Sequence, residues 1–231
     1  MVSFVHLHVH TQYSLLDGAS RIPDLISAAK AFNMPAVAIT DHGVMYGVID
    51  FYKEAVKQGI KPIIGCELYV APRSRFEKTT VEGDAYYHLV LLAANQQGYR
   101  NLLELVTRAN TEGFYYKPRV DKELLREYSE GLICLSGCLA GEIPALLLKG
   151  DYAGAEAVAN EYREIFGPDN FYLELQDHGL PEQQQVNNLL IRLGKKLGLG
   201  LVATNDIHYV KKTDAECHDI LLCIQTGKTV D

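Results

Sequence analysis

Short apolar runs alternate with longer segments of helical periodicity along most of the chain. Each run has the length of a buried strand, and each longer segment repeats its apolar residues at the spacing of a helix. This alternation is typical of βα units around a parallel sheet. The runs lie at 4–9, 36–40, 62–69, 89–93, 132–136, 171–176 and 201–204, and the predicted helices at 20–33, 47–58, 97–110, 140–148, 151–166, 181–197 and 213–225.

Seven predicted strands and seven helices indicate an α/β barrel, with one βα unit fewer than the usual eight, in a single domain of 231 residues. Ser20 is suited to cap the first helix, with Pro23 in its first turn, and Gly59 and Gly198 are suited to end helices. The stretch 71–87 has no clear periodicity, which predicts a long loop that covers a site or moves.

The composition, 48% hydrophobic and 22% charged, is that of an ordinary soluble protein. No apolar run is long enough to span a bilayer and no signal-peptide pattern begins the chain, so we expect a cytoplasmic location and no membrane partner. The five cysteines form no CxxC pair and are expected to be reduced. The net charge of −7 argues against a basic nucleic-acid-binding face, although bound divalent cations would reverse the sign locally.

Side chains suited to binding metals gather where the predicted strands end. In parallel βα architectures these ends meet at one mouth of the sheet, so we expect the side chains to converge there. His88 precedes its run instead of following it, so its approach to the mouth stays open. The candidates are His8, His10 and Asp17 at the first run, Asp41 and His42 after the second, Glu67 in the third, Cys138 after the fifth, and Asp206 and His208 after the seventh.

The first of these motifs, His-Leu-His-Val-His at 6–10, places three imidazoles on one face of an extended segment. His8 and His10 lie nearest the mouth, whereas His6 lies deeper and is expected to support the ligands or the core. Imidazole and thiolate favour zinc, while carboxylates also accept manganese and can bridge two ions. Taken singly, each motif has a plainer reading, such as a polar strand pair, a helix cap or a buried thiol. Their recurrence at consecutive strand ends favours a site with several ions.

Seven ordered sequence blocks carry a family resemblance. They are FVHLHVHTQYSLLDGA at 4–19, AITDHGVMYGVIDFYKEA at 38–55, GIKPIIGCELYV at 59–70, YHLVLLA at 87–93, GFYYKPRVD at 113–121, LSGCLAGEIP at 135–144 and ATNDIHYV at 203–210. On these blocks the chain resembles the PHP (polymerase and histidinol phosphatase) domain family. Within that family it is similar to the branch at the amino terminus of bacterial DNA polymerase III alpha subunits.

The resemblance implies a distorted, TIM-like (β/α)7 barrel that holds three divalent metal ions, zinc or manganese or both. It supports His88 as a ligand and gives Glu67 the role of a bridge between ions. Cys138 stands where other branches of the family often have His. The implied ligands are His8, His10, Asp17, His42, Glu67, His88, Cys138, Asp206 and His208.

The resemblance further implies a metal-dependent 3′–5′ exonuclease that proofreads DNA ends by multi-metal phosphodiester hydrolysis. Asp206, His208 and Glu67 are the expected catalytic residues, and Asp41 is a further candidate for moving protons. Expected partners are DNA at a single-stranded 3′ end or primer terminus, the remainder of a DNA-directed DNA polymerase chain beyond Asp231, and a separate proofreading subunit. The fragment itself is expected to lack polymerase activity.

Two loops interleave positive charge with aromatic rings, a combination suited to phosphates and splayed bases. A solvated loop, or an interface with the rest of the polymerase, explains the same residues equally well. Two other functions also stay open: a metal-stabilised scaffold without catalysis, and a small-molecule phosphatase of the histidinol-phosphate type. The candidate substrate contacts are Arg73, Arg75, Lys78, Tyr115, Tyr116, Lys117 and Arg119.

Overall fold

The computed structural model describes residues 4–81 and 83–230. Residues 1–3, 82 and 231 of the predicted domain therefore lie outside the described residues. The chain divides into two compact units. The terminal unit comprises Met1–Cys66 and Asp206–Asp231, and the central unit comprises Glu67–Asn205.

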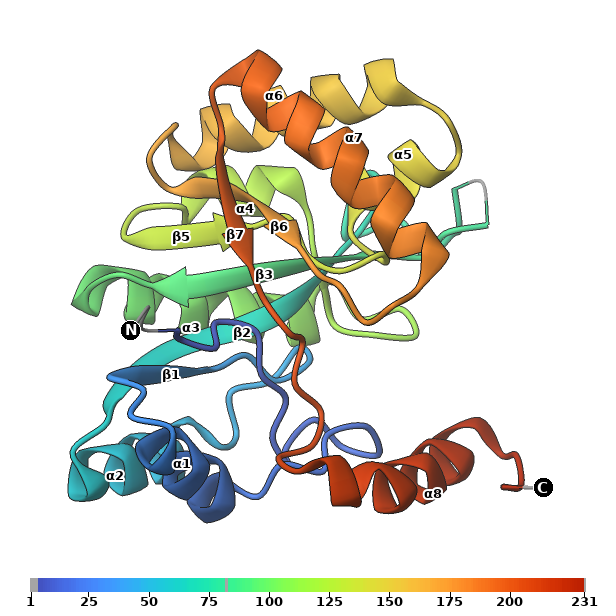
Figure 1. The fold of residues 1–231 in the computed structure, drawn as a ribbon. Coiled ribbons are helices and arrows are strands. Elements are labelled where there is room, and N and C mark those ends of the chain that lie inside the picture. Colours follow the sequence, from blue (N-terminus) through green and yellow to red (C-terminus); the bar gives the residue numbers. More distant parts are fainter. Residues whose placement is uncertain (1–3, 82, 231) are drawn as a thin grey trace. The chain divides into compact units, whose positions relative to one another are not determined.

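The terminal unit is built on a short buried strand and two helices that pack against each other. Strand β1 pairs in parallel with the first residues of β2, in a register that places Ala36 opposite Lys61. Helices α1 and α2 lie on the same side of β1 (Figure 1). The elements are α1 (Ile22–Ala31), β1 (Ala36–Ile39), α2 (Val48–Gln58), the first part of β2 (Lys61–Val70), the 3-10 helix η1 (Lys212–Asp214) and α8 (Ala215–Thr226).

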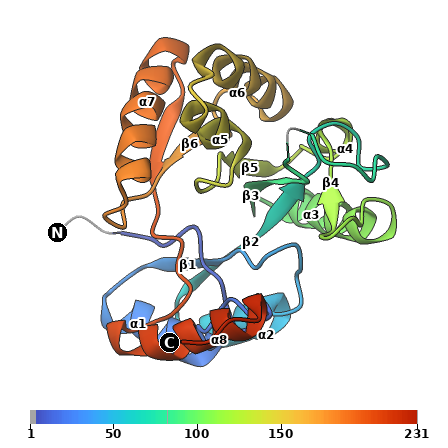
Figure 2. The ribbon, with the colours of Figure 1, turned by 90° about the vertical axis from the view of Figure 1, so that its right-hand side faces the viewer.

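The central unit contains the end of β2 and the sheet that follows it. Strands β5, β6 and β7 are parallel neighbours, β3 pairs with β5 in the antiparallel direction, and β4 pairs with β2. Helices α5, α6 and α7 gather beside β5, β6 and β7 (Figures 1 and 2). The elements are β3 (Tyr87–Ala93), α3 (Gln96–Thr111), β4 (Arg119–Val120), α4 (Lys122–Glu127), β5 (Leu132–Leu135), α5 (Glu142–Leu148), α6 (Tyr152–Phe166), β6 (Phe171–Leu175), α7 (Pro181–Leu197) and β7 (Gly200–Ala203).

Helix ends follow local chemistry in most places. Gly59 and Gly198 end α2 and α7 in the left-handed conformation that glycine adopts without strain, as predicted. The Asn95 side chain caps α3 by accepting a hydrogen bond from the Gly98 amide at 3.0 Å. Ser20 was wrongly predicted as the cap of α1: Arg21 occupies that position, and no side chain caps the helix.

Three features differ from the predicted pattern. Residues 4–9 form no regular strand; Val9 makes only an isolated parallel bridge to Ile207. Strand β4 and helix α4, of 2 and 6 residues, were not predicted because elements this short show no measurable periodicity. Strand β3 runs antiparallel to β5, whereas an all-parallel sheet was expected.

No helix in the described part of the chain is long and apolar enough to cross a membrane.

Candidate metal centre

The segment that carries His8 and His10 is fixed by backbone hydrogen bonds on both sides. The Thr40 amide donates to the Val9 carbonyl at 2.9 Å, and the His10 amide donates to the Ile207 carbonyl at 2.7 Å. The segment is therefore bonded on both sides like a strand, although its pairing consists of isolated bridges and not of a continuous ladder. Both imidazoles are fully buried.

A hydrogen-bond chain beneath His10 sets which of its nitrogens carries the proton. Ser14 Oγ donates to Asp41 Oδ1 at 2.9 Å, and the same Oγ lies 3.0 Å from His10 Nδ1. Because its one proton goes to Asp41, Ser14 accepts from Nδ1–H of His10. The neutral imidazole then presents an unprotonated Nε2, the form that binds a metal.

Asp206 lies between the two buried histidines. Its Oδ1 atom is 3.3 Å from Nε2 of His8 and 3.2 Å from Nε2 of His10. Its backbone is in the left-handed region, with φ of 46°, a conformation that aspartate tolerates better than most residues and that is often found at functional sites. The backbone therefore aims this carboxylate at both imidazoles.

Asp17 is a second carboxylate that lies between two histidines, as Asp206 does. Its Oδ2 atom lies 2.8 Å from Nε2 of His42 and 3.4 Å from Nε2 of His208. Burial disfavours the ionised form of Asp17, but the hydrogen bonds and charges of His208 and His42 outweigh burial and hold its pKa well below the usual value. The carboxylate is therefore ionised at neutral pH.

His208 is oriented by the backbone of Asp206. Its Nδ1 lies 2.9 Å from the Asp206 carbonyl, which can only accept, so Nδ1 carries a proton and Nε2 faces Asp17. Burial lowers the pKa of His208, yet the hydrogen bond with Asp17 and the charges of Asp206 and Asp17 raise it overall. A divalent cation would replace the proton that such an imidazole–carboxylate pair shares.

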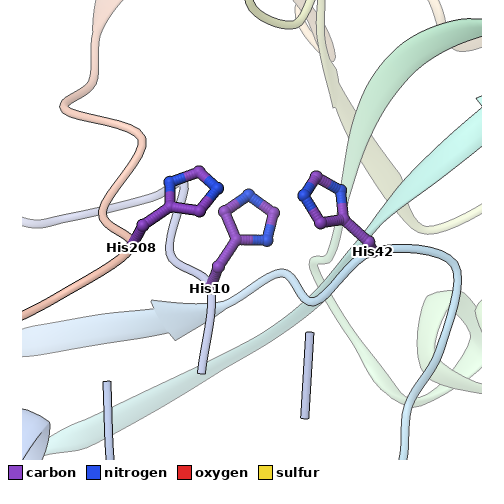
Figure 3. Close-up of side chains that lie close together, drawn as sticks. All are labelled: His10, His42 and His208. Atoms are coloured by element: carbon purple, nitrogen blue, oxygen red, sulfur yellow. The ribbon is translucent and has the colours of Figure 1, made fainter. Parts of the chain in front are cut away.

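The imidazoles of the terminal unit are stacked closely. The ring of His10 lies 4.0 Å from that of His42 and 4.4 Å from that of His208, and the three rings come together from separate segments (Figure 3). One ligand atom from each of them falls within 4.8 Å of the others, and the same holds for His8, His10 and Asp206. We call the full set the terminal donor cluster: His8, His10, Asp17, His42, Asp206 and His208.

The central unit carries the other three predicted ligands. Nδ1 of His88 lies 3.0 Å from Oε1 of the fully buried Glu67 and 3.7 Å from Sγ of Cys138. His88 is the second residue of β3, and β3 is antiparallel to β5. The start of β3 therefore lies beside the residues that follow β5, among them Cys138. The reversed strand explains how a histidine at the start of β3 reaches a thiol that follows β5.

A buried carboxylate fixes the turn that carries Cys138. Glu174 accepts a hydrogen bond from the Gly137 amide at 3.1 Å, and its own amide donates to Ser136 Oγ at 2.9 Å. Gly137 has a φ of 82°, which most side chains would disfavour, and a Cβ there would lie 2.8 Å from the His88 carbonyl. The turn therefore needs glycine to bring Cys138 close to His88.

Asp41 lies beneath the terminal donor cluster. Besides Ser14, it accepts hydrogen bonds from the Thr11 amide at 2.6 Å and the Thr11 hydroxyl at 2.8 Å, and it is 1% exposed. Burial raises the pKa of Asp41 despite these hydrogen bonds. These contacts assign it a supporting role for the loop after His10, and a role in moving protons stays a prediction.

The candidate substrate contacts divide into buried and accessible side chains. Arg75 is paired with Asp121 at 2.9 Å and with Glu112 at 2.6 Å. Arg119 is fully buried and donates to backbone carbonyls, including those of Gly113 and Glu77. Arg73 and Tyr116 are exposed, Tyr115 and Lys117 are half-buried, and the Lys78 ammonium donates to the carbonyls of Arg75 and Glu112.

Two residues near the cluster were not predicted from the sequence. Ser14, which orients His10, looks like any loop serine, and only its fit beneath the imidazole shows its role. His218, on α8, lies with Nε2 3.9 Å from Oδ1 of Asp17. Burial and the neighbouring His208 lower the pKa of His218, against the opposing effect of Asp17 and Asp219.

Comparison of the chain with known proteins shows its family. A model of the PHP domain family matches residues 6–178, and the chain belongs to the PHP domain family. It is 56% identical over 228 residues to the DNA polymerase III subunit alpha of Treponema pallidum, and 52% identical over 234 residues to that of Thermus aquaticus. These matches cover 98% and 100% of this chain but only 20% and 19% of the relatives. The chain thus spans about a fifth of their length.

Solved structures resemble the chain in fold. A protein assigned as a metal-dependent phosphoesterase from Bifidobacterium adolescentis aligns with a TM-score of 0.54 at 12% identity, covering 90% of this chain and 88% of that one. An amidohydrolase from Chromobacterium violaceum, solved with sulfate and no metal, aligns with a TM-score of 0.55 at 16% identity, covering 89% of this chain and 87% of that one. The predicted class, an α/β fold of the TIM-like barrel type, is confirmed.

Proposed function

We propose that this chain is the metal-dependent phosphoesterase domain of a bacterial replicative DNA polymerase, and that it removes nucleotides from DNA 3′ ends. The observation that carries the proposal is the terminal donor cluster, in which buried imidazoles and two carboxylates lie within ligand distance of one another. Glu67, His88 and Cys138 form a further set of donors within the central unit. Following the family resemblance, the chain would hold up to three divalent ions, zinc or manganese, and Glu67 would be one of their ligands.

Each residue has a part in the proposed hydrolysis. Bound cations would supply Lewis acidity toward the phosphate oxygens and lower the pKa of water. Asp206 holds the Nε2 atoms of His8 and His10, and Asp17 holds those of His42 and His208. His208 donates from Nδ1 to the Asp206 carbonyl, which leaves its Nε2 atom to hold an ion beside Asp17. The reacting phosphate would lie against these side chains.

The direct test is incubation of the chain with 3′-labelled single-stranded DNA and Mn²⁺ or Zn²⁺. We expect shortening of the labelled strand by the native chain and none by Asp206→Ala. Asp24→Ala, at an exposed position of α1, is the matched control and should keep full activity. Equal cleavage by native chain and Asp206→Ala, or none by either, would remove the proposal. Faster turnover of histidinol phosphate than of DNA would favour the small-molecule phosphatase instead.

A second candidate function is a metal-stabilised scaffold for the rest of the polymerase chain and for a separate proofreading subunit. It is favoured by Arg75 and Arg119, two candidate DNA contacts whose guanidinium groups are engaged inside the central unit. Under this proposal, chelation lowers the melting temperature while no preparation cleaves DNA. Both candidates place the chain in the cytoplasm, beside the polymerase residues that its relatives contain.

A further inference from the structure

Helix α8 brings one more histidine to the terminal donor cluster. His218 lies in the second turn of α8, and its Nε2 atom is 3.9 Å from Oδ1 of Asp17. Its ring centroid lies 5.5 Å from that of His208 and 5.3 Å from that of Tyr209. The side chain is 15% exposed, comparable to the 17% of Asp17 and 20% of His208. The His218 side chain is therefore as buried as those of the predicted ligands beside it.

The burial of His218 is not explained by the packing of helix α8. Helix α8 has no fully buried residue. The Nε2 atom of His218 is nevertheless buried and has no hydrogen-bond partner among the described residues. A buried polar nitrogen without a partner is destabilising, so an apolar side chain would serve a packing role better. Oδ1 of Asp17 lies 3.9 Å from this nitrogen, beyond hydrogen-bond distance.

The spacing around Asp17 indicates what that partner is. Oxygen and nitrogen ligands about 2.0–2.2 Å from a tetrahedral zinc ion are separated from each other by about 3.3–3.6 Å. Oδ2 of Asp17 lies 3.4 Å from Nε2 of His208, which is within this range, and Oδ1 lies 3.9 Å from Nε2 of His218, which is slightly beyond it. The distance to Nε2 of His42, 2.8 Å, is instead that of a direct hydrogen bond.

We propose that His218 is an additional metal ligand, whose Nε2 atom binds the same divalent ion as Asp17 and His208. The proposal rests on the metal binding of the proposed function. It adds a donor from α8 to the nine residues that the family resemblance supplies. It also ties α8, which has few packing contacts of its own, to the occupied site.

Zinc titration of the metal-free chain by calorimetry tests this ligand directly. We expect His218→Ala and His218→Gln to weaken one class of zinc sites by about tenfold or more. Glutamine keeps the size and a hydrogen-bond donor but is a poor zinc ligand. His218→Glu restores a ligand of similar reach and should recover part of the affinity. Gln225→Ala, exposed on the same helix, is the control and should match the native chain.

The visible spectrum of the Co²⁺-loaded chain gives a second readout. We expect the ligand-field bands of His218→Ala and His218→Gln to differ from those of the native chain and of Gln225→Ala. Native affinity and spectrum in His218→Gln, or a glutamate variant no tighter than the glutamine variant, would overturn the ligand role. A native chain that takes up neither Zn²⁺ nor Co²⁺ would instead overturn the proposed function, and this ligand with it.

Discussion

The Nδ1 atom of His10 lies 3.0 Å from the hydroxyl of Ser14, whose own proton goes to the buried carboxylate of Asp41. This chain of contacts fixes the orientation of the His10 ring, so that its Nε2 atom points toward Asp206. A residue that touches no ion can therefore control how well an ion is bound. The dependence of His10 on Ser14 can be measured.

Ser14→Ala should weaken zinc binding by about ten- to a hundredfold, since the His10 ring loses the acceptor that fixes its tautomer. The substitution also removes a donor from buried Asp41 and should lower the free energy of unfolding by about 1–3 kcal/mol. Zinc calorimetry and urea denaturation measure the two effects. Ser27→Ala, exposed on α1, should change neither. Native zinc affinity in Ser14→Ala would show that His10 does not need this support.

Cys138 should give the Co²⁺-loaded chain a thiolate-to-metal charge-transfer band in the near ultraviolet, because a thiol 3.7 Å from His88 Nδ1 can share an ion with it. The band should vanish in Cys138→Ser. It should persist in Cys217→Ser, whose thiol is exposed on α8 and is the matched control. A band that survives in Cys138→Ser would exclude this cysteine as a ligand.

Stability of the metal-free chain should depend on pH through Asp17 and His208. The pKa of Asp17 is lowered by its histidine neighbours, so its contribution is present above the unfolded value of about 3.9 and is lost as pH falls through the lower folded value. The pKa of His208 is raised, so its contribution is complete below about 6.5 and is lost as pH rises through the folded value.

The pair should therefore contribute most between about pH 4 and 6.5. Thermal unfolding across this range, with a chelator present, compares the native chain with Asp17→Asn. We expect the difference in melting temperature to be largest inside the range and to shrink as pH rises above it. A difference that stays constant from pH 5 to 9 would contradict the linkage.

Arg119→Ala should destabilise the chain by on the order of 3 kcal/mol, because the buried guanidinium donates to several backbone carbonyls that would lose their partner. Arg73→Ala, at an exposed position, should change stability by no more than about 0.5 kcal/mol. Urea denaturation followed by circular dichroism measures both. Fluorescence anisotropy with single-stranded DNA then tests Arg73 as a DNA contact, and unchanged affinity in Arg73→Ala would remove it from the candidates.

Metal removal should lower the melting temperature of the chain. An ion present at a hundred times its dissociation constant stabilises the folded state by about 2.7 kcal/mol, which corresponds to a shift of roughly 5–10 °C for a chain of this length. Differential scanning calorimetry with and without a chelator measures the shift. Asp206→Ala, which lacks a carboxylate of the cluster, should show a smaller shift. Equal melting temperatures with and without chelator would contradict metal binding by the native chain.

The sequence predicts the elements of this fold better than their directions. Seven apolar runs point to strands, but the runs do not say which strands pair or in which direction, because pairing depends on residues far apart in the chain. Strand β3 shows the limit: its run is plain in the sequence, while its antiparallel pairing with β5 appears only in the structure. For the same reason, strand periodicity left the approach of His88 open, and the family resemblance supported it.

For the candidate site, too, the sequence predicts some residues and misses others. His8, His10, His42, Asp206 and His208 were predicted because they lie at the ends of apolar runs or just after them, and the structure brings them together in the terminal unit. Side chains that act through another residue, or that come from a helix face, leave no such pattern. The positions of Ser14 and His218 are fixed by tertiary contacts alone. Arg119 and Arg73 were both predicted from the sequence as substrate contacts, but in the structure Arg119 is buried and Arg73 is exposed.

The reversed direction of β3 has a consequence for how the chain tolerates insertions and deletions. His88 is the second residue of β3 and is positioned by the pairing of that strand, so the loop before Tyr87 can change length without moving it. A deletion of one residue between His88 and Val90 would instead turn the imidazole to the opposite face of the sheet, since side chains alternate along a strand. Natural length variation should therefore gather before His88 and stop there.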